Sequence, residues 1–440
     1  MATTITAGNA TNGAAISSDN TGILELKSGT GSGTTAVTIG TNQAVTFAGA
    51  VTSSGNQTVT GNLTVDGNTT LGNANTDTIL MTAAPSIGGA GLGMGFGFRN
   101  RIINGAMVID QRNAGASVTP TTASTAFAVD RTSVIVSQNS KLTIQQNAGS
   151  VTPPAGFTNY LGATSSSAYS VLTSDYFNFN QTIEGFNIAD LGWGTANAQT
   201  VTLSFWVRSS LTGTHSGSLR NGAANRSYVF TFSVSSANTW EQKTVTIPGD
   251  TTGTWQTGNG AGMFVSFNLG AGSTFTTTAG AWGAGNFINA TGATSVVGTN
   301  GATFYITGVQ LEKGSTATSF DYRPYTTELQ LCQRYYTKLI TGSGNTSGFL
   351  VGTMSSATNA ARCSAPFPVT MRATPSFQFT NLRLFDGNTA VPVTSVIGNN
   401  SSTTNACVDL AASTFSSVVG RACVVIENAA NGACEFSSEL

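Results

Sequence analysis

Short groups of apolar residues, separated by Gly, Asn, Ser and Thr, fill the first 85 residues, as in VTFAGAVTSSGNQTVTGNLTVDGNTTLG at 45–72. Strands of three or four residues are unstable alone in water, so their apolar positions need a second layer. A single-chain β-solenoid needs rungs of fixed length, whereas the repeat length drifts here. We therefore predict an intertwined homotrimeric β shaft over 21–85, in which two identical chains help to bury Val45, Phe47, Val51, Val59, Leu63, Val65 and Leu71.

Longer segments with strict alternation of apolar and polar residues follow between 99 and 325. Examples are QTVTLSFWVRSS, RSYVFTFSVSS, GMFVSFNLGAG and ATFYITGVQLEKG. This alternation, with turn residues between the segments, is typical of a β-sandwich or jelly roll. In YVFTFSV we expect one strand face to carry Phe230, Phe232 and Val234, and the other to carry Val229, Thr231 and Ser233. The Gly-rich stretch before it, at 86–98, does not fit GxGxxG and is interpreted as a connector.

One segment, DYRPYTTELQLCQRYYTKL, breaks the β pattern. Apolar residues recur there at spacings of 3, 4 and 3, which predicts a short linking helix over 326–340 with a stripe of Leu329, Cys332, Tyr336 and Leu339. The stripe fits contact with two copies of itself in a trimer, which we favour, or packing on its own domain. The β pattern then resumes and predicts a smaller C-terminal β domain at 341–440. The fold class is therefore all-β: an elongated homotrimer with a shaft, a central β-sandwich, one short helix and a tip.

Composition excludes several classes of function. Charged residues make up 8% of the chain, against a typical ~25%, and the net charge is −1. Without a Lys/Arg cluster or a long apolar run, we expect neither nucleic-acid binding nor membrane insertion. The five cysteines are odd in number and form no CxxC, and the chain has one histidine. We therefore expect no zinc site, and predict buried free thiols in a protein folded in a reducing cytoplasm.

Residues suited to catalysis are few. His215 lies in GTHSGS, without a GxSxG motif, so we interpret it as a solvated loop residue. Glycan cleavage needs two carboxylates about 5–9 Å apart, and candidates such as Asp175, Glu184 and Asp190 cannot be paired from sequence. We predict no enzyme activity and no cofactor. A structural Ca²⁺ stays open as an alternative, although no DxDxDG run occurs.

Tryptophan offers the best candidate ligand sites, because sugars stack on aromatic rings that are rimmed by polar residues. Trp206 lies in an alternating strand and Trp240 at the start of one, so we expect both in the core. Gly and polar residues flank the other three, which we predict as loop platforms for a glycan: Trp193, Trp255 and Trp282.

Four segments together resemble bacteriophage tail fibres, most strongly those of phages of cyanobacteria and other aquatic bacteria. They are RNRIINGAMVIDQRNAG, FAVDR, VTLSFWVRSS and ITGVQLEKGSTATSFDYRPYTTELQLCQRYY, and the resemblance covers residues ~99–340. It implies a homotrimer in the virion tail, assembled in the bacterial host cytoplasm. Residues 1–20 would seat in a tail or baseplate protein, and a jelly roll like that of carbohydrate-binding modules would precede the distal tip.

The function that follows from this resemblance is adsorption to a host-cell receptor. The low charge favours a neutral surface polysaccharide as that receptor. Two alternatives remain: an appendage without a receptor role, such as a head fibre or baseplate linker, and a glycan-degrading tailspike.

Overall fold

The computed structural model divides the chain into two compact units, Met1–Ala83 and Ala84–Leu440. The residues that it describes are 24–28, 34–39, 45–47, 50–51, 58, 60, 64, 86–87, 90–91, 98–122, 125–340, 348–356, 359–413, 417–428 and 432–440. Residues 1–20, predicted to attach to the virion, lie outside these ranges, as do Val59, Leu63, Val65 and Leu71 of the predicted shaft core.

Short antiparallel strands form a sheet in the first unit, in the order β1-β2-β3. They are β1 (Leu24–Ser28), β2 (Thr34–Ile39) and β3 (Val45–Phe47). Val45, Phe47 and Val51 are 50%, 52% and 63% exposed within this single chain. Their side chains therefore present apolar surface that another layer could cover, while the intertwined homotrimer stays a prediction. In the connector, β4 (Ser86–Ile87) pairs with β5 (Ala90–Gly91).

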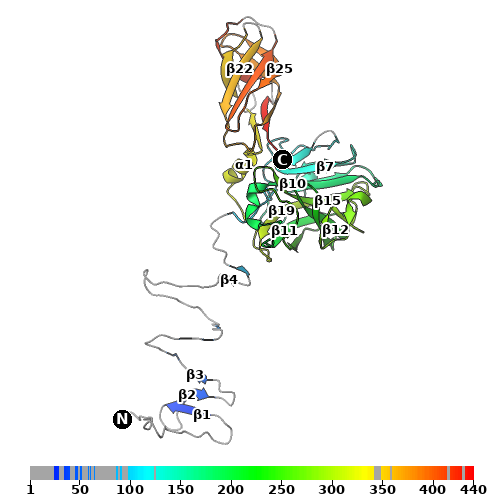
Figure 1. Cartoon of the computed structure of the whole chain (residues 1–440), viewed down its shortest axis with the longest axis vertical. Helices are drawn as coiled ribbons and strands as arrows, with labels where there is room; N and C mark the ends of the chain where they lie inside the picture. Colours follow the sequence, from blue (N-terminus) through cyan, green and yellow to red (C-terminus); the bar gives the residue numbers. More distant parts are fainter. Residues whose placement is uncertain are drawn as a thin grey trace. The chain divides into compact units, whose positions relative to one another are not determined.

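Two sheets build the β-sandwich predicted for 99–325 (Figure 1). The larger has the order β17-β13-β12-β15-β10-β7-β6, with bounds Trp282–Ala284, Arg226–Val234, Gly213–Asn221, Ala261–Ala271, Tyr176–Glu184, Thr132–Val136 and Ala126–Val129. The smaller has the order β14-β11-β19-β9-β8, with bounds Glu241–Ile247, Val201–Ser209, Thr303–Lys313, Leu161–Ser165 and Leu142–Gln146. Neighbours in both orders are mostly distant in sequence, so long-range pairing defines the fold.

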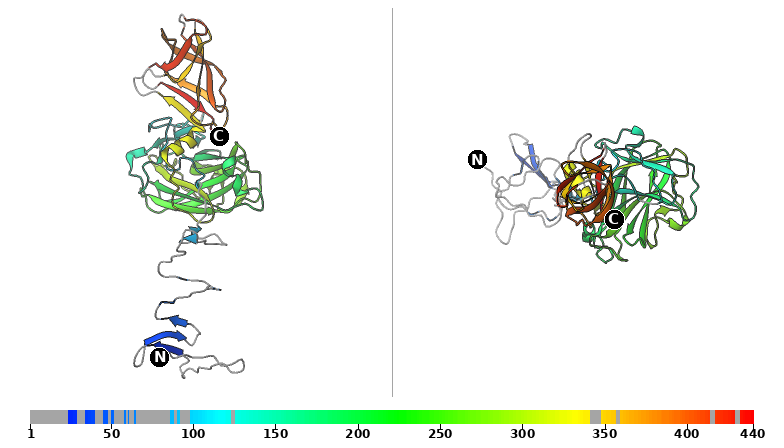
Figure 2. Two further views of the ribbon diagram at one scale, coloured as in Figure 1. Left: turned by 90° about the vertical axis from the view of Figure 1, so that its left-hand side faces the viewer. Right: turned by 90° about the horizontal axis from the view of Figure 1, so that it is seen from above.

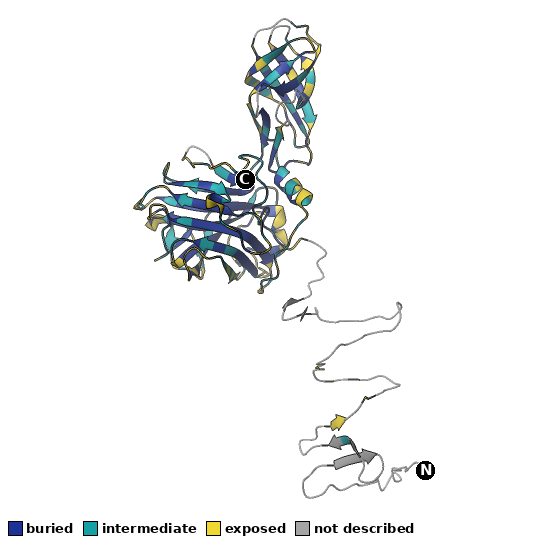
Figure 3. Cartoon of the chain, turned by 180° about the vertical axis from the view of Figure 1, so that it is seen from behind, coloured by how far each residue is buried: buried dark blue, intermediate teal, exposed yellow. Residues whose placement is uncertain are grey.

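The sandwich core lies between the two sheets (Figure 3). The Phe205 ring of β11 meets the rings of Phe232 and Phe267 from the opposite sheet, each at a centroid distance of 4.9 Å. The predicted alternation of β13 is confirmed, because Phe230 and Phe232 are buried in the core while Thr231 is exposed. Alternation also explains one wrong prediction: since the neighbours of Trp206 face the core, its own side chain faces away and is half-buried.

The helix is shorter than predicted. Helix α1 spans Tyr325–Gln333, and β20 (Tyr336–Ile340) starts three residues later. Tyr336 pairs with Ser437 and Leu339 with Cys434 of β28 (Ala433–Ser437), so a long-range partner overrides the local helical spacing. In this single chain Cys332 is 0% and Tyr336 3% exposed. Packing on their own domain, the second alternative, therefore accounts for these two residues.

A closed barrel forms most of the C-terminal β domain, seen end-on in the right-hand view of Figure 2. Its strands run in the order β21-β22-β26-β25-β24-β27, with bounds Leu350–Met354, Ala360–Pro366, Asn405–Ala412, Ala390–Asn399, Leu382–Phe385 and Ala422–Glu427. A second sheet, β20-β28-β23, adds Ser376–Thr380 and packs Phe436 into the barrel core.

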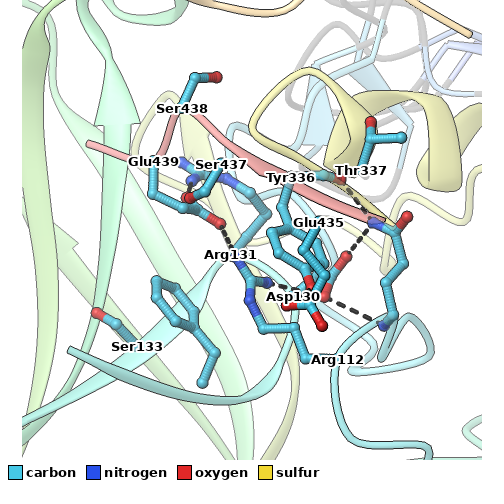
Figure 4. A network of polar contacts seen from close by, with 12 residues as sticks. Arg112, Asp130, Arg131, Ser133, Tyr336, Thr337, Glu435, Ser437, Ser438 and Glu439 are labelled. Atoms are coloured by element: carbon cyan, nitrogen blue, oxygen red, sulfur yellow. Dashed lines mark hydrogen bonds and ion pairs between the residues drawn. The ribbon is translucent and has the colours of Figure 1, made fainter. Parts of the chain in front are cut away.

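Buried ion pairs join the barrel side to the sandwich (Figure 4). Glu439, which follows β28, accepts hydrogen bonds from Arg131 and, at 2.9 Å, from Arg112. Arg112 also pairs with Asp130 at 3.0 Å, and burial raises the pKa of Asp130 to about 6. Together these contacts form a junction network of charged side chains that lie largely out of water.

The cysteines are free, as predicted. Cys332, Cys363, Cys423 and Cys434 are buried and Cys407 is half-buried. Within the described ranges, no helix is long and apolar enough to cross a membrane.

Candidate functional site

The outer face of the seven-stranded sheet is polar and yet buried. Along β10, Phe177 and Phe179 face the core, so the alternate residues Tyr176, Asn178 and Asn180 lie on the opposite face. Asn178 and Asn180 are only 2% exposed. The smaller sheet of the sandwich covers the opposite face of β10, so it cannot account for their burial. The same face of the neighbouring strands carries four more buried polar residues: Ser216, Ser218, Ser266 and Asn268.

A covering segment, defined here as residues 273–290, explains this burial. It contains β16 (Thr276–Thr277) and β18 (Asn289–Ala290), which pair in parallel, and between them the edge strand β17 of the seven-stranded sheet. The Asn289 side-chain oxygen accepts hydrogen bonds from Ser216 Oγ at 2.8 Å and from Asn268 Nδ2 at 2.9 Å. The segment is thus tied to the polar sheet face by side-chain hydrogen bonds, rather than by an apolar core.

A groove remains between the covering segment and strands β7, β10 and β12. Its hollow has a volume of about 350 Å³, and it is lined by Ile135, Tyr176, Asn178, Arg220, Phe275, Asn286 and Ile288. The rings of Tyr176 and Phe275 meet edge to face with centroids 5.2 Å apart. Aromatic rings, amides and a guanidinium therefore line one concave surface. Such a combination can pack against C–H groups and donate hydrogen bonds to hydroxyl or carboxylate oxygens.

Arg220 is the charged residue of this groove. Its side chain donates to Asn286 Oδ1 at 2.6 Å, to Ser266 Oγ at 3.0 Å and to Asn180 Oδ1 at 3.4 Å. All three acceptors are neutral, and the buried Nε has no hydrogen-bond partner among the described residues. Burial lowers the pKa of Arg220 to about 10, so the guanidinium is still cationic at neutral pH.

The three tryptophans predicted as platforms come together, although they are far apart in sequence. The ring centroid of Trp193 lies 4.6 Å from that of Trp255 and 5.3 Å from that of Trp282, and both pairs of rings meet edge to face. Each indole N–H donates to a backbone carbonyl, and Trp193 and Trp255 are 6% and 8% exposed. Trp282 is half-buried, and none of the three lines the groove. Their role in ligand binding stays a prediction.

Sequence reasoning was wrong about His215. It lies in β12, is 0% exposed and packs against Phe232 with nearly parallel rings and a centroid distance of 5.8 Å. Its Nε2 lies 3.1 Å from the Leu211 carbonyl oxygen, and its Nδ1 is buried without a hydrogen-bond partner among the described residues. Burial lowers the pKa of the ring. The polar residues around His215 suggested a loop, but their alternate side chains face the covered sheet surface.

The three carboxylates named as candidates for glycan cleavage serve separate structural contacts. Asp175 directly precedes the nine-residue strand β10 and Glu184 is its last residue, which places them about 30 Å apart at ~3.3 Å per residue. Asp175 accepts from Tyr169 Oη at 2.6 Å, and Glu184 accepts from Tyr335 Oη at 2.6 Å. Asp190 pairs with Arg101 at 2.8 Å. Asp175 and Glu184 therefore lie too far apart to act on one glycosidic bond.

The described residues contain no group of three His, Cys, Asp or Glu side chains that could hold a metal ion. A structural Ca²⁺ stays an alternative.

The groove residues were missed at the sequence level. A signal existed in SGSLRN, where Arg220 alternates with the core residue Leu219 on a strand. Nothing in the local pattern shows that residues 273–290 return to cover this face, so an exposed surface arginine would have been expected.

Comparisons with known proteins find structural similarity at low sequence identity. No family model matches the chain, and no curated protein matches it. Solved structures that are similar to part of it include the enzymatically active domain of tailspike protein 4 of bacteriophage CBA120, at 11% identity and a TM-score of 0.25, covering 49% of this chain and 21% of that chain. A family 11 carbohydrate-binding module of Clostridium thermocellum is 10% identical with a TM-score of 0.23, and the match covers 47% of this chain and 99% of the module. A xylan-binding domain from Paenibacillus barcinonensis is 8% identical with a TM-score of 0.21, and the match covers 47% of this chain and 99% of that domain.

Proposed function

We propose that the groove binds a saccharide and that the chain is the receptor-binding tail fibre of a phage. The observation that carries the binding proposal is the groove itself. Its volume of about 350 Å³ falls within the ~300–1,000 Å³ of small-molecule sites. Tyr176 and Phe275 supply aromatic surface, while Asn178 and Asn286 supply amides for hydroxyl groups. Amides of this kind can both donate to and accept from a sugar hydroxyl.

Binding without cleavage is the second part of the proposal. Among the residues that the structure describes, neither an aspartate nor a glutamate lines the groove. Hydrolysis by the usual mechanism uses two carboxylates that flank the bond. The groove thus offers groups for recognition and lacks the pair of groups for acid–base chemistry.

The fibre role rests on the sequence resemblance and on the apolar surface of the first unit. Exposed Val45, Phe47 and Val51 favour coverage by two further copies of the chain. A trimer would present three copies of the groove, and linked weak sites gain avidity without any new contact. The chain would then reside in the virion tail, joined through its first 20 residues to a tail or baseplate protein.

A glycan array probed with labelled full-length protein tests the binding proposal. We expect wild-type protein to bind a subset of bacterial surface polysaccharides, and Tyr176→Ala to weaken that binding about tenfold because aromatic stacking is lost. Tyr325→Ala is the matched control, since Tyr325 is 63% exposed and lies outside the groove. Equal binding by both variants would place the saccharide elsewhere.

Light scattering on the full chain tests the fibre proposal separately. Three copies of the 44.9 kDa chain are expected in the native particle. A saturable block of phage adsorption by free protein would distinguish the receptor-binding role from a head fibre or baseplate linker. A monomeric chain would contradict the shaft and the avidity argument together.

A further inference from the structure

The groove contains a positive charge that has no carboxylate partner in the part of the chain that the structure describes. Among the described residues, two arginines are more than 90% buried when backbone and side chain are counted together, Arg131 at 3% exposed and Arg220 at 8%. Arg131 pairs with the carboxylate of Glu439, whereas Arg220 contacts two amides and a hydroxyl. A buried charge without a counter-charge is unfavourable unless something compensates for its lost hydration.

Several other partly buried arginines of this chain have a carboxylate partner. Arg226 is held by both oxygens of Asp250 at 2.9 and 2.7 Å, and Arg334 by both oxygens of Glu184 at 2.9 and 2.5 Å. With only 19 acidic residues in 440, carboxylates are scarce, and yet these buried partners are in place. The neutral surroundings of Arg220 therefore differ from those of Arg131, Arg226 and Arg334, each of which has a carboxylate partner.

The guanidinium is also fixed in position. Its contacts to Asn286, Ser266 and Asn180 come from three different elements, and its Cζ lies 5.1 Å from the centre of the Phe264 ring. Arg220 nevertheless lines the hollow, so a ligand in the groove can reach it. A preorganised guanidinium loses little entropy when it binds an oxyanion, and its planar set of donors matches a carboxylate or a sulfate.

We propose that the groove selects an acidic saccharide, whose carboxylate or sulfate ester is received by Arg220. This inference rests on the proposed saccharide-binding function and names its ligand class. The neighbouring Asn178 amide donates to the Phe179 carbonyl at 3.4 Å and lines the groove, where it can meet sugar hydroxyls beside the anionic group. The proposed ligand is acidic, whereas the low net charge of the chain favours a neutral polysaccharide. One uncompensated charge inside the groove affects a ligand bound there, whatever the net charge of the chain.

Matched pairs of saccharides provide the test. We would measure binding of full-length protein to oligogalacturonate, to the same oligosaccharide after reduction of its carboxyl groups, and to a sulfated and a desulfated galactan. The neutral members of the glycan panel described above are measured beside them. Wild-type protein should bind at least one acidic member about 10- to 100-fold more tightly than its neutral counterpart, as expected for a hydrogen-bonded charge pair. The carboxylate and sulfate pairs identify which oxyanion is preferred.

Variants show whether Arg220 is responsible. Arg220→Gln should bring the acidic and neutral members to within about threefold of each other, while Arg220→Lys should keep part of the preference because the charge remains. Arg208→Gln is the matched control, since Arg208 donates to the Asn238 carbonyl and does not line the groove. If Arg220→Gln fails to fold, Arg220→Lys and the salt dependence of wild-type binding test the role of the charge instead. A charge pair weakens as salt rises, so wild-type affinity for the acidic member should fall with salt more than affinity for the neutral member.

The outcomes separate the two proposals. Equal wild-type affinity for acidic and neutral members, with saccharide binding intact, would overturn the acidic-ligand inference alone. An acidic preference that survives in Arg220→Gln would also overturn it. Absence of binding to every saccharide on the panel would remove the proposed function, and this inference with it.

Discussion

Replacing Glu439 by glutamine would test whether the junction network holds the barrel side to the sandwich. The Glu439 side chain is 12% exposed and accepts hydrogen bonds from Arg131 and Arg112, whose side chains are 2% and 13% exposed. After the change, Arg131 keeps its bond to the Thr182 carbonyl at 2.6 Å and its position over the Tyr335 ring at 3.5 Å, but no negative charge. Arg112 still has Asp130 at 3.0 Å.

The expected loss of stability follows from these contacts. Removing one partner of a buried ion pair costs about 3–5 kcal/mol, because it leaves the other charge unpaired in a poorly hydrated site. Two features reduce this value here: the amide oxygen of the introduced glutamine can still accept one hydrogen bond, and Arg112 retains a carboxylate. We therefore expect a decrease of about 2–3 kcal/mol in the free energy of unfolding. At roughly 2–4 °C per kcal/mol for a domain of this size, the melting temperature should fall by about 4–12 °C.

Urea unfolding and calorimetry of the full chain would measure the change. Asp190→Asn is the control, since Asp190 pairs with Arg101 but its side chain is 57% exposed. An exposed pair contributes about 0–1 kcal/mol, so this variant should unfold almost like the wild type. If Glu439→Gln lost no more stability than the control, buried ion pairs would not be what fixes the junction.

Two further predictions concern the sandwich. Phe205→Ala should lower the free energy of unfolding by about 3–5 kcal/mol, because the Phe205 ring fills the space between the sheets beside Phe232 and Phe267. Each kcal/mol lowers the melting temperature by roughly 2–4 °C, so a melting temperature within about 2 °C of the wild type would contradict this prediction. For His215, burial lowers the folded-state pKa below the unfolded value of about 6.5, so the unfolded chain binds the proton more readily. Stability should therefore be lost as the pH falls below about 6.5, and His215→Phe should show a flatter pH profile by thermal melts from about pH 7 to 5; identical slopes would contradict the assignment.

Period-two alternation predicted the sandwich well, and β13 shows why. Whether Phe230 and Phe232 face the core depends only on their own strand, so the local pattern contains that information. The same rule, applied strictly, would have turned Trp206 away from the core. The helix boundary was beyond reach for a different reason, since the strand at Tyr336 exists because β28, far along the chain, pairs with it.

The groove shows a second limit of local reasoning. Its position depends on residues 273–290 returning across a sheet face whose strands come from separate parts of the chain. Polar residues on that face look in sequence like an ordinary solvated surface. Burial of Ser216, Ser218 and Arg220 is therefore a property of the tertiary structure, and it is this burial that lowers the pKa of Arg220.

A chain with so few charges can still recognise a ligand through charge. The energy of a charge interaction depends on the dielectric around it as well as on the number of charges. On an exposed surface, Arg220 would be one screened cation among 18 basic residues. Beneath the covering segment, the same guanidinium is held by Asn180, Ser266 and Asn286 and has lost most of its water. The polar hydrogen bonds that close this face would thus make one residue selective in the proposed site, a property that net charge alone cannot indicate.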